Sequence, residues 1–357
     1  KVLWGTVRIA LVLLLAWGLC KVFSNYLDGQ ITELYRLNQT QVNAANGTEQ
    51  KDKGAVLFAE TFRNDTGMLV MGSSELGSPV PENPKNLLPN QYYTKNVSYT
   101  GHAYVQNALQ AMLLGANSDT VDGSDVVIVE SIQWFMGGDA TGFLSNFSEL
   151  SFYRFLQNGA LSEESKEYLC NRFIEKQESG AHNVFDELTR RFSEGSKLHF
   201  IGQVAEKAKK VLPDFFQLHV DYPQTYTLAK LYTSDSFLGR LCYYITCPYY
   251  SIRNEFLSLK DKFSAYRYLK DLGGQSGAAI TKTVDWDALY KTAEKEGKAA
   301  CTNNDLYVYD EYYTKYLAER FDDLKDVYTS ESATDPKEWD DFHFFLLVCK
   351  ELGIEPY

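Results

Sequence analysis

Residues 67–76 read GMLVMGSSEL, and this stretch decides the fold. The run GMLVM is apolar enough for a buried strand, and the glycine and two serines that follow are typical of a turn. Residues 96–100 repeat the strand pattern and end at Gly101, and residues 125–132 (DVVIVESI) form a mostly apolar run. Residues 102–114 lie between these two and carry apolar side chains at helical spacing. Strand, helix and strand at this spacing predict an α/β fold with a doubly wound, mostly parallel sheet.

Helical patterns dominate the chain from about residue 144 to 328. They predict a mainly helical insertion between two parts of the α/β core, residues 55–143 and 329–357. Within the insertion we expect helices at 162–177, 183–192 and 252–272, with Pro248 separating two aromatic-rich helices. After it, residues 335–352 predict a helix with Asp335 as the N-cap and Pro336 at the first helical position. A strand of the core is expected to begin at Ile354.

The N-terminal residues 1–24 carry an apolar run whose uninterrupted part is IALVLLLAWGLC at 9–20. A bilayer span needs about 20 residues, so we expect a single membrane anchor that starts near Val2, with Arg8 extending to the interface. Lys1 and Arg8 on the leading side predict a cytoplasmic N-terminus and an external C-terminal part. A cleaved signal peptide and a lipoprotein signal are the alternatives, but no small-residue cleavage site follows Cys20.

Residues 25–54 predict a juxtamembrane helix followed by a polar linker. The chain begins with Lys1 rather than Met, and its end reads as the first residues of a strand. We therefore expect a fragment that is trimmed at both ends.

The composition excludes several classes of protein. The chain has 357 residues, a net charge of −12 and 14% aromatic residues, so a disordered chain and a nucleic-acid-binding protein are both disfavoured. The six cysteines form no CxxC pair, and most are expected to be buried, although one disulfide stays open. There is no HExxH motif, no Asp/His cluster and no glycine-rich phosphate loop, so we expect neither a metal nor a cofactor.

Polar or glycine residues follow each of the three predicted strands. Ser74 comes after the first strand, Gly101 after the second, and Gln133 after the third. Ligands of open α/β sheets bind at the carboxyl ends of the strands, so these residues are expected to share one crevice. One nucleophile with several fixed hydrogen-bond donors is the arrangement that acyl transfer needs. The alternative is that Ser74 only caps a helix that has Glu75 in its first turn.

The general base for such a serine stays open. His343 lies three residues after Asp340, but on one helical turn the two look like a surface pair. His102 directly follows Gly101 and could approach the crevice. A separate feature, LGRLCYYITCPYY at 238–250, is interpreted either as the core of a helical hairpin or as a surface that faces the bilayer or a membrane partner.

Taken together, these motifs resemble the DltD family of teichoic acid D-alanylation in Gram-positive bacteria. The resemblance rests on the N-terminal anchor, GSSEL at 72–76 and the S-x-QWF block at 131–135. It continues with Trp286-Asp287, the tyrosine-rich stretch at 303–313 and EWDDF…LGIEP at 338–356. The family is similar to SGNH-type hydrolases, which implies an SGNH or flavodoxin-like sheet with Ser74 as the nucleophile. Gly101 and Gln133 then fall near the oxyanion positions.

The resemblance also implies a function and a set of partners. It implies an external, membrane-anchored O-acyltransferase that receives a D-alanyl group on Ser74 from a DltB-type membrane O-acyltransferase. The acceptor would be a polyol hydroxyl of lipoteichoic or wall teichoic acid, and the D-alanyl carrier protein and a small membrane peptide of the pathway are further expected partners. The family's Asp and His lie in a second DxxH after the next core strand, so they are expected beyond Tyr357. A cell-wall acyl esterase or thioesterase and a non-catalytic scaffold remain as alternatives.

Overall fold

The fold is described from a computed structural model of the chain. It covers residues 2–42, 53–62, 67–77, 81–131, 134–135, 140–179, 199–211, 221–273, 282–302, 310–318 and 335–357. The elements of the first part of the chain are α1 (Val2–Val42), α2 (Gly54–Phe62), β1 (Gly67–Met71), the 3₁₀ turn η2 (Ser74–Gly77), α3 (Pro84–Leu87), β2 (Asn96–Thr100), α4 (Asn107–Ala116), α5 (Ser118–Val121) and β3 (Asp125–Ile128).

The helical elements that follow are α6 (Ala140–Asn146), α7 (Glu149–Gln157), α8 (Glu163–Ser179), α10 (His199–Val211), α11 (Pro223–Tyr232), α12 (Phe237–Asp271), α13 (Trp286–Ala300), α14 (Asp310–Tyr312), the π-helical turn η4 (Tyr313–Leu317) and α16 (Pro336–Glu351).

The three predicted strands form one small parallel sheet in the order β2-β1-β3. β1 pairs with β2 from Gly67 opposite Asn96 onward, and it pairs with β3 on its other side. The ladder continues past the strand ends, because Gly72 N donates to Thr100 O at 2.8 Å. The prediction of a parallel α/β core is therefore confirmed for these strands, although β3 stops at Ile128 rather than at residue 132.

The end of the chain returns to the same sheet. Asp335 caps α16 by accepting a hydrogen bond from Lys337 N, and Pro336 begins the helix as predicted. Beyond it, Tyr357 N donates to Val126 O at 2.8 Å, and Ile128 N donates to Tyr357 O at 2.9 Å. Pro356 forms a parallel bridge with Val126, so the last residues lie along the open edge of β3.

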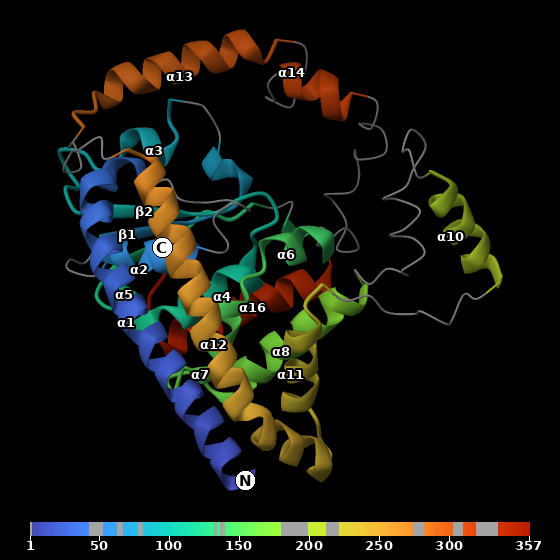
Figure 1. The fold of residues 1–357 in the computed structure, drawn as a ribbon. Coiled ribbons are helices and arrows are strands. Elements are labelled where there is room, and N and C mark those ends of the chain that lie inside the picture. The colour runs from blue at the N-terminus through green and yellow to red at the C-terminus, as the bar shows by residue number, and fades with distance from the viewer. Residues whose placement is uncertain are drawn as a thin grey trace.

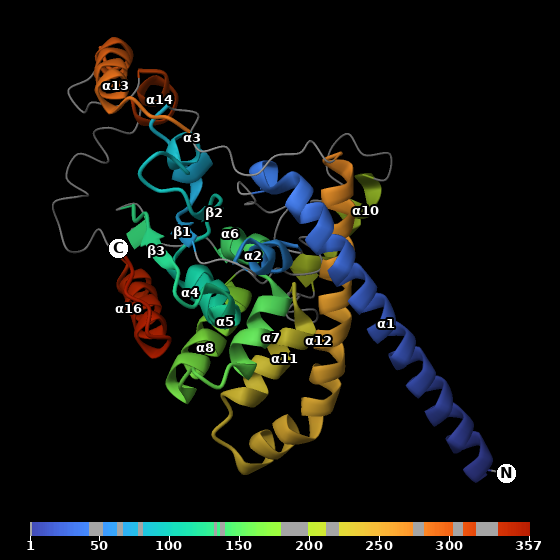
Figure 2. The same cartoon turned by 90° about the vertical axis from the view of Figure 1, so that its left-hand side faces the viewer.

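The two faces of the sheet have different coverings (Figures 1 and 2). Leu69 and Met71 of β1 belong to the main apolar core, which α4, α7, α8 and α16 complete. Val70, which points to the opposite face as strand alternation requires, packs in a smaller cluster with Leu76 and Tyr99. The main core thus lies between one face of the sheet and these four helices.

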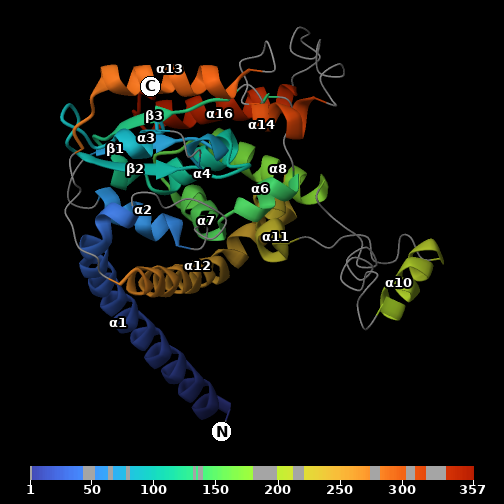
Figure 3. The ribbon, with the colours of Figure 1, turned by 90° about the horizontal axis from the view of Figure 1, so that it is seen from above.

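α1 and α12 lie side by side as two long helices outside this core (Figures 1 and 3). Leu27, Ile31 and Tyr35 of α1 are buried in a separate apolar cluster with Ala265 and Leu269 of α12. Two ion pairs join the same helices, Lys21 with Glu255 at 2.6 Å and Lys262 with Asp28 at 2.7 Å. In the part of the chain that the structure describes, no helix meets the length and hydropathy needed to cross a membrane.

Two expectations about helices need correction. The helix predicted from residue 102 begins at Asn107, because Tyr104 has a φ of +69° and Gln106 is extended. α12 is continuous through Pro248, so this proline does not separate two helices. Packing of α12 against its neighbours outweighs the local helix-breaking tendency of the proline. α1 is one continuous helix from Val2 to Val42. The helix expected at 183–192 lies outside the described residues.

Candidate active site

The turn after β1 separates the two serines by environment. Ser73 is buried, and its Oγ donates to His102 O at 2.9 Å, which ties the end of β1 to the loop after β2. Ser74 is exposed and begins η2. This contact gives the Ser73 hydroxyl a structural partner. Ser74 is therefore the serine of the pair whose side chain is open to a substrate.

Gly101 brings the ends of β1 and β2 into close contact. A Cβ at Gly101 would lie 2.2 Å from Gly72 O and 3.0 Å from Ser73 N. Those atoms belong to the backbone and cannot move aside as a flexible side chain would. The position therefore requires a glycine for the close approach that packs its backbone against the serine turn.

Glu75 holds the serine turn from two sides. Its Oε2 accepts from Ser73 N at 2.9 Å, and its Oε1 accepts from the indole Nε1 of the buried Trp134 at 3.2 Å. The Asn83 side chain also donates to the backbone oxygens of Glu75 and Leu76. Glu75 thus joins the end of β1 to the chain that follows β3. The sequence predicted only that Glu75 lies in the first turn of a helix.

Gln133, the third predicted site residue, lies outside the described residues. Its neighbour Trp134 is fixed by the bond to Glu75, and Phe135 stacks on Trp339 of α16 at a centroid distance of 4.1 Å. Phe135 O also accepts from Asp335 N at 2.7 Å. The S-x-QWF block therefore links the serine turn with the N-terminus of α16.

Glu130 and two amides of α4 lie behind the serine turn and were not singled out from the sequence. Val129 N donates to Met71 O at 2.7 Å, so Glu130 follows the last ladder bond between β3 and β1. Gln110 Nε2 donates to Gly72 O at 3.1 Å from the α4 side. The signal that could have found Glu130 is an acidic residue at the end of the apolar run DVVIVESI.

Burial raises the pKa of Glu130 to about 7. The side chain of Asn107 opposes this shift, and the negative charge of Glu75 adds to it. Both carboxylate oxygens of Glu130 are buried without a hydrogen-bond partner, as are Asn107 Oδ1 and Gln110 Oε1. The region behind the serine turn therefore holds several buried acceptors that lack a donor among the described residues.

The histidines considered as bases occupy different environments. His102 is partly buried, and its Nδ1 lies 3.2 Å from Ala103 O. Asp340 and His343 are both exposed on α16, as expected of a helix-surface pair. The buried carboxylate of this helix is Asp341, which binds Arg172 Nε through both oxygens at 2.9 and 3.1 Å. That contact packs α16 onto α8 and lies outside the serine turn.

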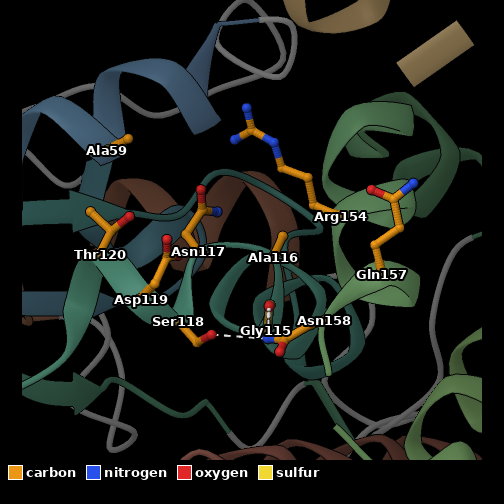
Figure 4. A pocket seen from close by; sticks show the side chains of 10 residues that line it. All are labelled: Ala59, Gly115, Ala116, Asn117, Ser118, Asp119, Thr120, Arg154, Gln157 and Asn158. Carbon is orange, nitrogen blue, oxygen red and sulfur yellow. Dashed lines mark hydrogen bonds between the residues drawn. The ribbon is translucent and has the colours of Figure 1, made fainter. Parts of the chain in front are cut away.

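A separate cavity of about 470 Å³ is lined by residues of α2, α4, α5 and α7 (Figure 4). The Arg154 side chain extends into it from α7. Asn158 closes one side by donating to Gly115 O at 2.7 Å and to Ser118 Oγ at 2.9 Å. Its lining includes none of Ser74, Gly101 and Glu75, so it is distinct from the serine turn. Among the described residues, no group of His, Cys, Asp and Glu is arranged to hold a metal ion.

Comparison with known proteins gives one consistent family. A family model described as "DltD protein" matches residues 44–214 and 202–357. "Protein DltD" of Bacillus subtilis (strain 168) is 23% identical over 357 residues, which cover 98% of this chain and 77% of that protein. "Protein DltD" of Staphylococcus aureus (strain NCTC 8325 / PS 47) is 24% identical over 146 residues, which cover 40% of this chain and 37% of that protein.

Proposed function

This chain belongs to the DltD family, and on that premise we propose that it acts in the D-alanylation of teichoic acids as a serine-dependent O-acyltransferase with an SGNH-like core. The observation that carries the proposal is that the two serines of the turn lie in different environments. Ser73 is buried and bonded to His102 O, whereas Ser74 is exposed at the carboxyl edge of a parallel sheet.

Two acyl transfers would pass through Ser74. In the first, Ser74 Oγ attacks the carbonyl carbon of a D-alanyl group delivered by a DltB-type membrane O-acyltransferase, the bond to the donor's leaving group breaks, and that group takes the serine proton. In the second, a polyol hydroxyl of teichoic acid attacks the serine ester, loses its proton through a base, and regenerates the serine hydroxyl. Each step forms an oxyanion that fixed N–H donors stabilise.

The remaining machinery is part of the same proposal. Gly101 and Gln133 are proposed oxyanion donors, and the close packing of the Gly101 backbone against Gly72 supports the choice of Gly101. The His and Asp that complete the serine's activation are proposed to follow Tyr357. The D-alanyl carrier protein and a small membrane peptide are the further proposed partners.

A membrane location on the external side is also proposed. α1 exposes Leu15, Leu19 and Val22 to 68–70% of their surface, and α12 begins with Phe237 at 84% and Ile245 at 67% exposure. The starts of both helices lie at the lower end of the molecule in Figures 1 and 2, so the exposed apolar side chains share one end. Apolar and aromatic side chains in this arrangement suit a bilayer and its interface.

The experiment that tests the proposed function is fluorophosphonate labelling, in detergent, of the protein extended past Tyr357 to include the proposed His and Asp, followed by mass-spectrometric mapping. We expect modification of Ser74, its loss in Ser74→Ala, and its retention in a folded Ser73→Ala control. Incubation with a D-alanyl donor and lipoteichoic acid should then place D-alanine on the polymer. Release of free D-alanine alone would support the esterase alternative, and absence of any covalent adduct on Ser74 would support the scaffold.

A further inference from the structure

A group of buried acceptor atoms behind the serine turn lacks donors. Asn107 Oδ1 and Gln110 Oε1 are closed to solvent and make no hydrogen bond within the described residues, and the two buried oxygens of Glu130 have only the Asn107 amide close enough to act on them. Leaving one such group unpaired in a protein interior costs about 1–3 kcal/mol, and more for a charged group. Buried polar groups are therefore almost always paired in native proteins, and an unpaired cluster indicates a missing donor.

The cluster lies directly against the backbone of the proposed nucleophile's turn. Asn107 and Gln110 are one helical turn apart on α4, and Gln110 Nε2 donates to Gly72 O at 3.1 Å. That bond fixes the orientation of the Gln110 amide and leaves its oxygen as an acceptor. Glu130 follows the last bond between β3 and β1. Gln110 thus contacts the serine turn from the helix, and Glu130, at the end of the neighbouring strand, lies close enough to Asn107 for that side chain to affect its pKa.

The atoms of this cluster determine which kind of ligand it can bind. It offers acceptor oxygens and one carboxylate, so it suits a group with several N–H donors and a positive charge. A primary ammonium has three donors, no acceptor and a compact charge. An α-amino group has an ordinary pKa of about 7.7–8.0 and is therefore mostly charged at neutral pH.

We propose that Glu130, Asn107 and Gln110 form a subsite for the α-ammonium group of an aminoacyl chain carried on Ser74. This inference rests on the proposed function, because it concerns the acyl group that the serine accepts. In an aminoacyl ester the amino nitrogen is two bonds from the carbonyl carbon. The subsite therefore has to lie next to the nucleophile, as the cluster behind Gly72 does.

The pKa of Glu130, raised to about 7 by burial, is consistent with a carboxyl that lacks its partner in the free protein. An arriving ammonium group would stabilise the carboxylate and supply the missing donors. The subsite would then distinguish aminoacyl groups from plain acyl groups of the same size.

The first test compares two thioesters that differ only in the amino group. The full chain in detergent is mixed with D-alanyl or propionyl N-acetylcysteamine thioester, and acylation of Ser74 is followed by intact-protein mass spectrometry. We expect Glu130→Gln to slow D-alanyl transfer by about 10- to 100-fold, the range for loss of a hydrogen-bonded charge, and to leave propionyl transfer within about 2-fold. The exposed Asp122→Asn, at the other end of β3, is the matched control and should change neither rate. An equal loss with both thioesters, or no loss with either, would overturn the inference.

The second test does not depend on acylation. Binding of D-alaninamide and of propionamide is measured by calorimetric titration on the Ser74→Ala chain, alone and combined with Glu130→Gln or Asp122→Asn. We expect D-alaninamide to bind, propionamide to fail, and the Glu130 substitution alone to weaken binding by about 10-fold or more. No binding of D-alaninamide at millimolar concentration would mean that a water or a shared proton satisfies the cluster, and would overturn the subsite. Failure of the proposed function appears instead as absence of acylation by both thioesters.

Discussion

Replacement of Glu75 by glutamine is a direct probe of how the serine turn is held. The carboxylate accepts from Ser73 N at 2.9 Å with one oxygen and from Trp134 Nε1 at 3.2 Å with the other. A glutamine has only one acceptor oxygen, so one of these two N–H groups would face an NH₂ group. The lost hydrogen bond to a charged acceptor is worth about 1.5–3 kcal/mol, and since Glu75 is only partly buried we expect about 2 kcal/mol of lost stability.

The effect on chemistry should exceed the effect on stability. If Ser73 N loses its acceptor, the backbone that positions Ser74 shifts, and a misplacement of about 1 Å can cost roughly 100-fold in rate. We expect the rate of phosphonate labelling of Ser74 to fall by about 10- to 100-fold in Glu75→Gln. Urea unfolding followed by tryptophan fluorescence measures stability in the same samples. The exposed Glu355→Gln serves as the control.

Two results would refute this reasoning about Glu75. Labelling at the wild-type rate would show that the two bonds do not position the nucleophile. A loss of labelling that merely follows the unfolded fraction at the assay temperature would show that Glu75 acts only through stability. A Glu75→Asp variant separates these cases further, because it keeps the charge but cannot reach both donors at once.

Three further changes have outcomes set by the structure. Gly101→Ala should abolish phosphonate labelling and lower stability by at least about 1–3 kcal/mol because its Cβ overlaps backbone atoms, whereas Gly77→Ala, with open space around it, should be neutral in the same urea titration. Arg172→Met should lower the free energy of unfolding by about 3–5 kcal/mol, because the buried Asp341 loses its ion pair and Glu338 keeps only Lys176. Replacement of the exposed Lys298 by methionine should cost at most about 1 kcal/mol. Burial raises the pKa of Glu130 to about 7 in the native state, above its ordinary value of 4.5, so the native state binds this proton more tightly than the unfolded state does. The free energy of unfolding should therefore fall as the pH rises from about 4.5 to 7. Glu130→Gln should flatten that part of the pH profile measured by urea unfolding.

The strands could be predicted because their signals are local. The strand patterns at 67–71 and 96–100 are each followed by a glycine at the carboxyl end of the strand, and Asp335 with Pro336 marks the start of α16. Each of these patterns predicts its structure from a few neighbouring residues. The return of the chain to the sheet at Ile354 was also expected, and the pairing of Tyr357 with Val126 agrees with it.

The contacts that hold the candidate site could not be predicted in the same way. Glu75 binds Trp134, which is 59 residues away, and Ser73 binds a backbone oxygen 29 residues away. Such pairs depend on how strands and loops assemble, and no local period marks them. Pro248 misled the sequence reading for a related reason, since packing of α12 on α1 and α11 sustains the helix through it.

α1 has a mechanical consequence that its packing makes possible. A continuous helix of 41 residues is about 62 Å long at 1.5 Å per residue. Its second half is fastened to α12 by apolar contacts and by the Lys262–Asp28 pair. With its N-terminal part held in a bilayer, as proposed, the helix would keep the rest of the protein at a fixed distance from the membrane. The serine crevice would then work at a fixed height, and this height would select which part of a growing polymer chain can reach it.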